Sequence, residues 1–315
     1  MTHPHDLLAG IDLGGTKCLG VLATPAGQVI AERQFPVAEA GGAAHALTRA
    51  TRELVALAEA ERASIAGFGI SVPAVIDPTS GHAVRAPHAG WDGFDLQDHL
   101  KGLPAPHWIE NDVNLAALGE GMSGRARGVA DYAVIAVGTG LGGAIVSGGR
   151  LLRGSHGAAG ELGGLPGLDP QLPGSDLEQT LSGAAIATRV ATYLADHPAA
   201  AAELASADAR AVFEAAANGS AAGADLLAPV LQALAASISA LSAVVDPALV
   251  ILDGSVGRGL APFLPRVLDL VGRITPCPPE VVVSDLEPSA TAIGAVRLAL
   301  QNLPLSPNRE EEGVH

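Results

Sequence analysis

The chain has 315 residues, of which 48% are hydrophobic, and it carries a formal net charge of −15. This length predicts two domains with full hydrophobic cores rather than one. The acidic balance argues against nucleic acid or an anionic membrane surface as a partner. The only two cysteines, Cys18 and Cys277, are too few for a disulfide framework or a four-ligand metal site.

The sequence gives no sign of a membrane span or an export signal. No apolar run approaches the roughly 18 residues that a transmembrane helix needs. The amino terminus, residues 1–6, is short and polar and lacks the hydrophobic block of a signal peptide, so we expect a cytoplasmic protein. Residues 306–315 are polar and acidic and are expected to be a disordered tail.

Residues 7–35 predict three strands joined by tight turns. Asp12 ends the first strand and is followed by the turn Gly14-Gly15-Thr16-Lys17. A carboxylate at a strand tip, beside backbone N–H groups that glycine leaves accessible, suits a metal-bound phosphate. The alternative is an ordinary hairpin turn that happens to contain an aspartate.

The remaining pattern predicts an α/β protein with an internal duplication. The strand, glycine turn and strand of residues 7–23 recur at 132–146, around Gly138-Thr139-Gly140. The other predicted elements are helices at 43–62, 111–121, 177–195, 205–217, 226–245 and 289–301, strands at 65–72, 107–110, 250–252 and 281–284, and a glycine loop at 253–257.

The second glycine turn is the sharper phosphate motif. Residues 138–143 contain four glycines and one threonine hydroxyl between two strands. A strand follows it, so it is neither a Rossmann fingerprint nor a P-loop, both of which open a helix. Gly254 and Ser255, after the strand at 250–252, add a third candidate phosphate contact. Three such turns fit a cleft between duplicated domains, and plain sheet turns are the alternative.

Three acids are candidates for ligand chemistry. Asp112 stands at a strand-to-helix junction beside Asn111, where it either caps the helix or acts as a general base toward a hydroxyl. Glu161 lies in a glycine-rich loop, where a ligand contact is expected. Glu178 is either a ligand contact or an ordinary acid in the first turn of a helix.

Taken together, these segments resemble the ROK family of sugar kinases in the actin-like, hexokinase-like superfamily. The resemblance runs in order over nearly the whole chain. It rests on residues 12–17, 69–77, 110–120, 138–143 and 160–163.

The resemblance implies an α/β fold of two duplicated actin-like (ribonuclease H-like) domains around a central cleft. The small domain would comprise residues 1–116 and 290–305, and the large domain residues 117–289. It also implies a homodimer that uses ATP and Mg²⁺ to phosphorylate the 6-hydroxyl of a hexose. Asp112 would be the general base, and Asp12 would hold Mg²⁺ through water. The implied sugar contacts are Asn111, Asp112, Glu161, Glu178, Ser71 and His88, and the implied phosphate contacts are Asp12, Gly14, Gly15, Thr16, Lys17, Gly138, Thr139, Gly140, Gly254 and Ser255.

The chain departs from the family pattern after Glu161. Gly164 replaces a histidine that contacts zinc and sugar, and no cysteine occurs at 165–177, where the family has three. We therefore predict a member without zinc, whose loop is stiffened by proline. His88 also stands where the family usually has asparagine.

These departures leave the sugar open among glucose, the first choice, and mannose, fructose or an N-acetylhexosamine. The donor is expected to be ATP, with polyphosphate as an alternative. A sugar-binding protein that has lost catalysis is a second interpretation. A transcriptional regulator is disfavoured, because the first strand starts near residue 7 and leaves no room for a DNA-binding module.

Overall fold

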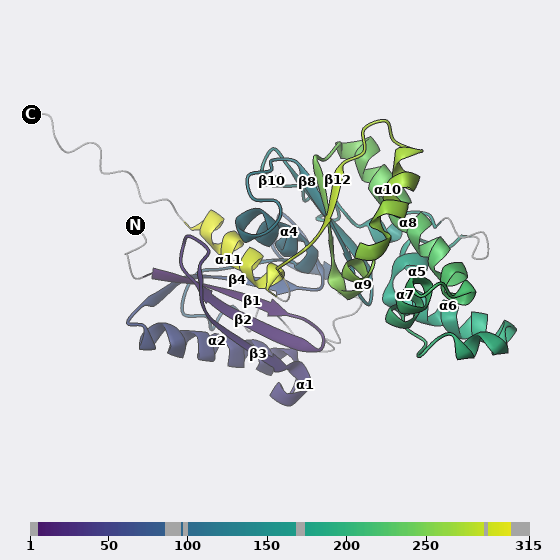
Figure 1. The fold of residues 1–315 in the computed structure, drawn as a ribbon. Helices are drawn as coiled ribbons and strands as arrows, with labels where there is room; N and C mark the ends of the chain where they lie inside the picture. Colours follow the sequence, from purple (N-terminus) through teal and green to yellow (C-terminus); the bar gives the residue numbers. More distant parts are fainter. Residues whose placement is uncertain (1–5, 86–95, 97–99, 168–173, 287–288, 304–315) are drawn as a thin grey trace, which may run out of the picture. The chain divides into compact units, whose positions relative to one another are not determined.

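The computed structural model describes residues 6–85, 96, 100–167, 174–286 and 289–303. The chain divides into two compact units, residues 1–123 with 288–315 and residues 124–287 (Figure 1). The first boundary lies seven residues beyond the expected 116/117, because helix α4 (Asp112–Ser123) runs unbroken to the end of unit 1. The central cleft between the units stays a prediction, and the expected tail at 306–315 lies outside the described residues.

Unit 1 is built on a five-stranded sheet of order β3-β2-β1-β4-β7. Strand β1 pairs antiparallel with β2 and parallel with β4, which in turn pairs parallel with β7. Its elements are β1 (Asp6–Leu13), β2 (Lys17–Ala23), β3 (Val29–Pro36), α1 (Val37–Ala40), α2 (Ala43–Ala60), β4 (Ser64–Val72), β5 (Val75–Ile76), β6 (Ala83–Arg85), β7 (His107–Asn111), α4 and α11 (Ala290–Asn302).

Both faces of the unit 1 sheet are covered, which explains why β1 reads as a continuous apolar run. Alternate residues such as Ile11 and Leu13 join the core under helix α2, with Leu54 of that helix. Leu8 belongs to the core on the other face, together with Val296 of helix α11. Helix α11 therefore contributes to the core on the second face of the unit 1 sheet.

Helix α11 lies unusually close to its neighbours, and glycine makes this approach sterically allowed. A Cβ atom on Gly69 of β4 would lie 1.8 Å from the Ala295 carbonyl oxygen. A Cβ atom on Gly294 would lie 1.7 Å from the Leu115 carbonyl oxygen of α4. Any side chain at either position would force the backbones of the sheet and the two helices apart.

Unit 2 repeats the sheet of unit 1, and this confirms the predicted duplication. Its order is β10-β9-β8-β11-β12, with β8–β9 antiparallel and β8–β11–β12 parallel. The elements are β8 (Tyr132–Val137), β9 (Leu141–Ser147), β10 (Arg150–Leu151), η1 (Leu162–Gly164), α5 (Glu178–Leu181), α6 (Gly183–Asp196), η2 (Pro198–Ala202), α7 (Ala209–Ala217), α8 (Ala221–Val245), β11 (Leu249–Asp253), α9 (Gly254–Gly259), η3 (Ala261–Phe263), α10 (Leu264–Gly272) and β12 (Glu280–Val283).

Two predicted elements of unit 2 were wrong in type or extent. The helix predicted at 177–195 is split into α5 and α6, because Ser182 leaves the helical conformation and caps α6 by accepting from the Ala185 N–H. The glycine loop predicted at 253–257 is the start of helix α9. Only Gly254 is in the left-handed region, with φ of 79°, and the helix begins directly there.

Helix α8 differs from the expectation that no segment reaches membrane-span length. It has 25 residues, and by length and composition alone it is long and apolar enough to cross a bilayer. In unit 2, however, 56% of its apolar window is buried, including Leu227, Val230 and Leu234. This is the burial of a core helix, with α7 and α10 packed against it.

Candidate functional site

The predicted site residues of unit 1 meet at the carboxyl edge of its parallel strands. Asp12 of β1 is in register with Ser71 of β4, and Val72 is in register with Asn111 at the end of β7. Asp112 follows as the first residue of α4. Open parallel sheets place ligands at this edge, and three separate stretches of sequence deliver polar groups to it.

Burial raises the pKa of Asp12 to about 6, and the neighbouring Ser71 hydroxyl opposes part of that rise. A carboxyl group with this pKa is ionised at neutral pH but is poorly solvated, so it gains from a cation. In the described residues no three His, Cys, Asp or Glu side chains gather as a metal cage. A single carboxylate fits Mg²⁺, which one or two carboxylates commonly hold together with water and substrate phosphates.

Asn111, rather than Asp112, caps helix α4. Asn111 Oδ1 accepts from the backbone N–H groups of Val113 (2.9 Å) and Asn114 (3.1 Å), and Asn111 Nδ2 donates to the Ala74 carbonyl oxygen (3.3 Å). Asp112 Oδ1 accepts from the same Val113 N–H, at 3.0 Å. The structure therefore favours Asn111 over Asp112 as the cap, and Asp112 is partly exposed at the sheet edge.

The β1–β2 turn is the first of the predicted phosphate loops. The Gly14 N–H donates to the Lys17 carbonyl oxygen at 3.0 Å, and the Thr16 carbonyl oxygen accepts from Val37. Gly15, Thr16 and Lys17 are exposed. The turn thus presents a hydroxyl and an ammonium group to solvent beside Asp12, as phosphate binding requires.

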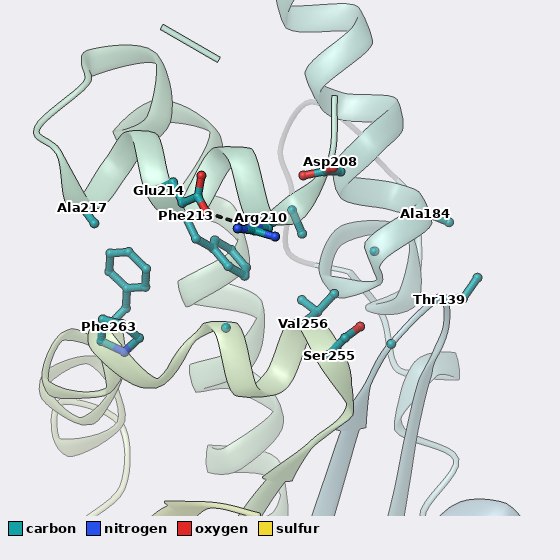
Figure 2. Close-up of a pocket in the computed structure, with 15 residues that line it drawn as sticks. Thr139, Ala184, Asp208, Arg210, Phe213, Glu214, Ala217, Ser255, Val256 and Phe263 are labelled. Atoms are coloured by element: carbon teal, nitrogen blue, oxygen red, sulfur yellow. Dashed lines mark hydrogen bonds and ion pairs between the residues drawn. The ribbon is translucent and has the colours of Figure 1, made fainter. Parts of the chain in front are cut away.

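Unit 2 contains a cavity of about 660 Å³ beside the second glycine turn. Figure 2 shows Thr139 and Ser255 at one side of it and Phe263 at the other. The rings of Phe213 and Phe263 lie 6.0 Å apart and are tilted by 57°. Hydroxyls at one end and aromatic carbon at the other match a ligand with an anionic part and a flat apolar part.

Neighbouring elements hold the β8–β9 turn in place. The Gly183 N–H at the start of α6 donates to the Gly138 carbonyl oxygen at 2.8 Å. Gly254 packs against the end of β8, since a Cβ atom on it would lie 2.3 Å from the Val137 carbonyl oxygen. Gly254 does not line the cavity, whereas Ser255 does. Among the predicted phosphate contacts, Gly254 is thus placed as a packing residue.

The two predicted acids of unit 2 differ in setting. Glu178 is half-buried, and its carboxylate lies between the glycine turn and the Glu161 loop, because Cβ atoms on Gly140 and Gly163 would lie 2.9 and 3.1 Å from its oxygens. Glu161 is exposed and precedes η1. His88, the remaining sugar candidate, lies outside the described residues.

The loop after Glu161 is closed by backbone hydrogen bonds at its described ends. The Gly167 N–H donates to the Ser175 carbonyl oxygen at 2.7 Å, and the Leu177 N–H to the Leu165 carbonyl oxygen at 2.8 Å. Asp176 and Gln179 exchange side-chain to backbone bonds. This ladder fixes the start of α5, where Glu178 stands. That the loop needs no zinc stays a prediction.

Sequence reasoning missed most of the cavity wall. Helix α7 supplies Arg210, Phe213 and Glu214, its N-cap residue is Asp208, and the segment after α9 supplies Phe263. Arg210 and Glu214 pair at 2.8 Å (Figure 2). The available signal was the rarity of phenylalanine, because only five occur in the chain and two of them meet here.

Two sheets of identical strand order, with polar groups or glycine turns at the carboxyl edge of each, define a duplicated α/β fold of the hexokinase-like kind. The sequence model of the ROK family matches residues 8–302, and the chain belongs to that family. It is 28% identical to a glucokinase of Thermotoga maritima, over 95% of this chain and 99% of that protein.

Two further comparisons agree. The bifunctional enzyme NanE/NanK of Brucella suis is 31% identical over 94% of this chain and 54% of its own length. A ROK family glucokinase of Streptomyces griseus, solved in complex with glucose and AMPPNP, is 26% identical with a TM-score of 0.72, covering 94% of this chain and 99% of that one. The chain spans about half the length of the first curated relatives it matches.

Proposed function

We propose that this protein is an ATP- and Mg²⁺-dependent hexose kinase that phosphorylates the 6-hydroxyl group. The observation that carries the proposal is the unit 2 cavity, which joins a glycine turn with two hydroxyls to an aromatic wall. A polyphosphate donor has no apolar group to contact the aromatic wall, whereas a nucleoside triphosphate would occupy both ends of the cavity. ATP is therefore the proposed donor, in keeping with the AMPPNP complex of the Streptomyces griseus relative.

In the proposed reaction, Asp112 accepts the proton of the sugar 6-hydroxyl as that oxygen attacks the γ-phosphorus. The bond from the γ-phosphorus to the β,γ-bridging oxygen breaks, and ADP leaves with its electron pair. Asp112 is suited to this role because Asn111 carries the helix cap. Mg²⁺, held by Asp12 through water, would offset charge on the phosphates. Phosphoryl transfer of this kind depends mainly on positioning and charge stabilisation.

The proposed sugar contacts are Asp112, Asn111, Ser71, Glu161 and Glu178. Asn111 retains one amide hydrogen for a ligand, since its oxygen and other hydrogen are engaged in the cap and with Ala74. Glucose is the first sugar to test, followed by mannose, fructose and N-acetylmannosamine. We also propose a cytoplasmic homodimer without zinc, nucleic acid or membrane partners, on the strength of family resemblance and net charge.

An ADP-release assay with coupling enzymes tests the proposal over this panel of sugars, with ATP and with polyphosphate as donors. We expect turnover with ATP on at least one hexose and little with polyphosphate. Absence of turnover on every sugar with either donor would refute the kinase proposal. Turnover with polyphosphate alone would refute the nucleotide assignment of the cavity. Light scattering and metal analysis of the purified protein test the homodimer and the absence of zinc.

A further inference from the structure

Glu178 lies beside two loops, each of which would bind a different ligand in the proposed reaction. A Cβ atom on Gly140 would lie 2.9 Å from Glu178 Oε1. A Cβ atom on Gly163 would lie 3.1 Å from Glu178 Oε2. Gly140 belongs to the glycine turn beside the cavity, and Gly163 to the loop that carries Glu161. The carboxylate therefore stands at the junction between the phosphate and sugar subsites of unit 2.

The negative charge of Glu178 is not balanced within the described residues. Its side chain has no hydrogen bond or ion pair with any residue in that part of the chain, although it is half-buried. Two arginines of unit 2 have partners other than Glu178, with Arg258 paired to Asp253 at 2.5 Å and Arg189 donating to the Thr180 carbonyl oxygen. A half-buried carboxylate without a partner raises the electrostatic cost of bringing another anion to the same place.

We propose that Glu178 couples sugar binding to nucleotide binding through its charge, in addition to contacting the sugar. Without sugar, the charge of the carboxylate disfavours binding of the nucleotide's triphosphate at the glycine turn. When a sugar hydroxyl donates to the carboxylate, the charge is partly satisfied and drawn toward the sugar loop, and the nucleotide binds more tightly. The inference rests on the proposed function, because it needs phosphates at residues 138–140.

The size of the effect follows from Coulomb's law. A unit charge roughly 7 Å from a phosphate, at an effective dielectric constant of about 20 to 40, changes a dissociation constant by roughly 7- to 50-fold, and screening by salt makes the change smaller. By thermodynamic linkage, bound nucleotide must raise sugar affinity by the same factor as sugar raises nucleotide affinity. Such coupling would keep ATP off the enzyme until a sugar is present, which limits wasteful hydrolysis.

Isothermal titration of Mg²⁺-AMPPNP tests the proposal, without sugar and with saturating glucose or whichever panel hexose gives the highest kcat/KM. Glu178→Gln keeps the shape and removes the charge, so we expect it to bind AMPPNP severalfold more tightly than wild type when sugar is absent. Sugar should then no longer tighten nucleotide binding. Glu178→Asp keeps the charge and should stay close to wild type in sugar-free nucleotide affinity.

Glu280→Gln is the matched control for loss of one negative charge. Glu280 is exposed at the amino end of β12, the opposite edge of the same sheet from the glycine turn. We expect it to leave both affinities unchanged. A sugar-free affinity of Glu178→Gln equal to or weaker than wild type would overturn the coupling, because loss of a purely structural contact weakens binding. Failure of wild-type protein to bind AMPPNP with or without sugar would instead overturn the proposed function.

Discussion

Asp112 and Asn111 are adjacent in sequence, and the structure predicts that their substitution separates catalysis from stability. Asp112→Asn removes the proposed general base, whose contribution is on the order of 10²- to 10⁴-fold in turnover. Its effect on folding should stay within about 0.5 kcal/mol, because Asn111 binds the two first-turn N–H groups and asparagine keeps the shape of the aspartate side chain.

Asn111→Ala has the opposite balance. It removes a cap that satisfies two backbone N–H groups, as well as the bond to Ala74. Losing a helix cap costs about 1 kcal/mol, within a range of roughly 0.5 to 2 kcal/mol. For a unit of about 150 residues, such as unit 1, that lowers the melting temperature by about 2–4 °C. Turnover should fall less than in Asp112→Asn, since the base is still present although its position is less fixed.

The assay pairs steady-state ADP release with thermal unfolding for both variants. AMPPNP titration serves as the control, since neither residue belongs to the unit 2 cavity and nucleotide affinity should hold. If Asp112→Asn retained more than about a tenth of wild-type turnover, Asp112 would not be the base. If it instead lowered the melting temperature as much as Asn111→Ala, the assignment of the cap would be refuted.

Three further outcomes are expected. Burial raises the Asp12 pKa from 3.8 to about 6, so the folded state binds the proton more tightly than the unfolded state. The ionised carboxylate therefore lowers the free energy of unfolding above pH 6, and this loss of stability disappears as the pH falls toward 4. The Asp12→Asn variant should therefore unfold at a higher urea concentration than wild type at pH 8, and it should lose turnover. The difference between the two urea midpoints should be smaller at pH 5; a difference that does not change with pH would contradict burial of the charge as the cause. Gly294→Ala should destabilise unit 1 by more than 2 kcal/mol or prevent folding in a urea titration, because its Cβ would overlap a carbonyl, whereas Gly272→Ala, with open space around it, should not. Gly167→Ala should raise the sugar KM but not the nucleotide KM by disturbing the loop ladder, since its Cβ would lie 2.8 Å from the Asp176 carbonyl oxygen; equal changes in both constants would argue against a local effect.

The sequence was informative wherever a local pattern decides the structure. The apolar runs that end at Asp12 and Val137, each followed by glycines, predicted two copies of one sheet, and both sheets have the same strand order. Alternation within β1 is hidden because both faces of the strand are buried, yet the glycine turn still marks its end. The Asp12 and Thr139 turns were found for the same reason.

The missed features depend on contacts between distant residues or on a choice between neighbours. Nothing local distinguishes Asn111 from Asp112 as the cap, because both residue types are strong cap formers. The aromatic wall joins Phe213 to Phe263, which lie 50 residues apart and form no sequence motif. Helix α9 was not predicted because Gly254 and Gly257 are typical of a loop. In the structure both glycines pack against Val137.

Helix α11 has a consequence for how the chain acquires its structure during synthesis. The face of the unit 1 sheet around Leu8 and Val21 is covered by helix α11, with Met122 of α4 also packed against it. Unit 2 is contiguous in sequence, and the chain enters it after the first part of unit 1 and leaves it before the second part. At ribosomal rates of about 5–20 residues per second, its 124–287 segment takes roughly ten to thirty seconds to emerge. During that interval the nascent unit 1 sheet exposes apolar surface that chaperones recognise, and unit 2 can complete its fold first.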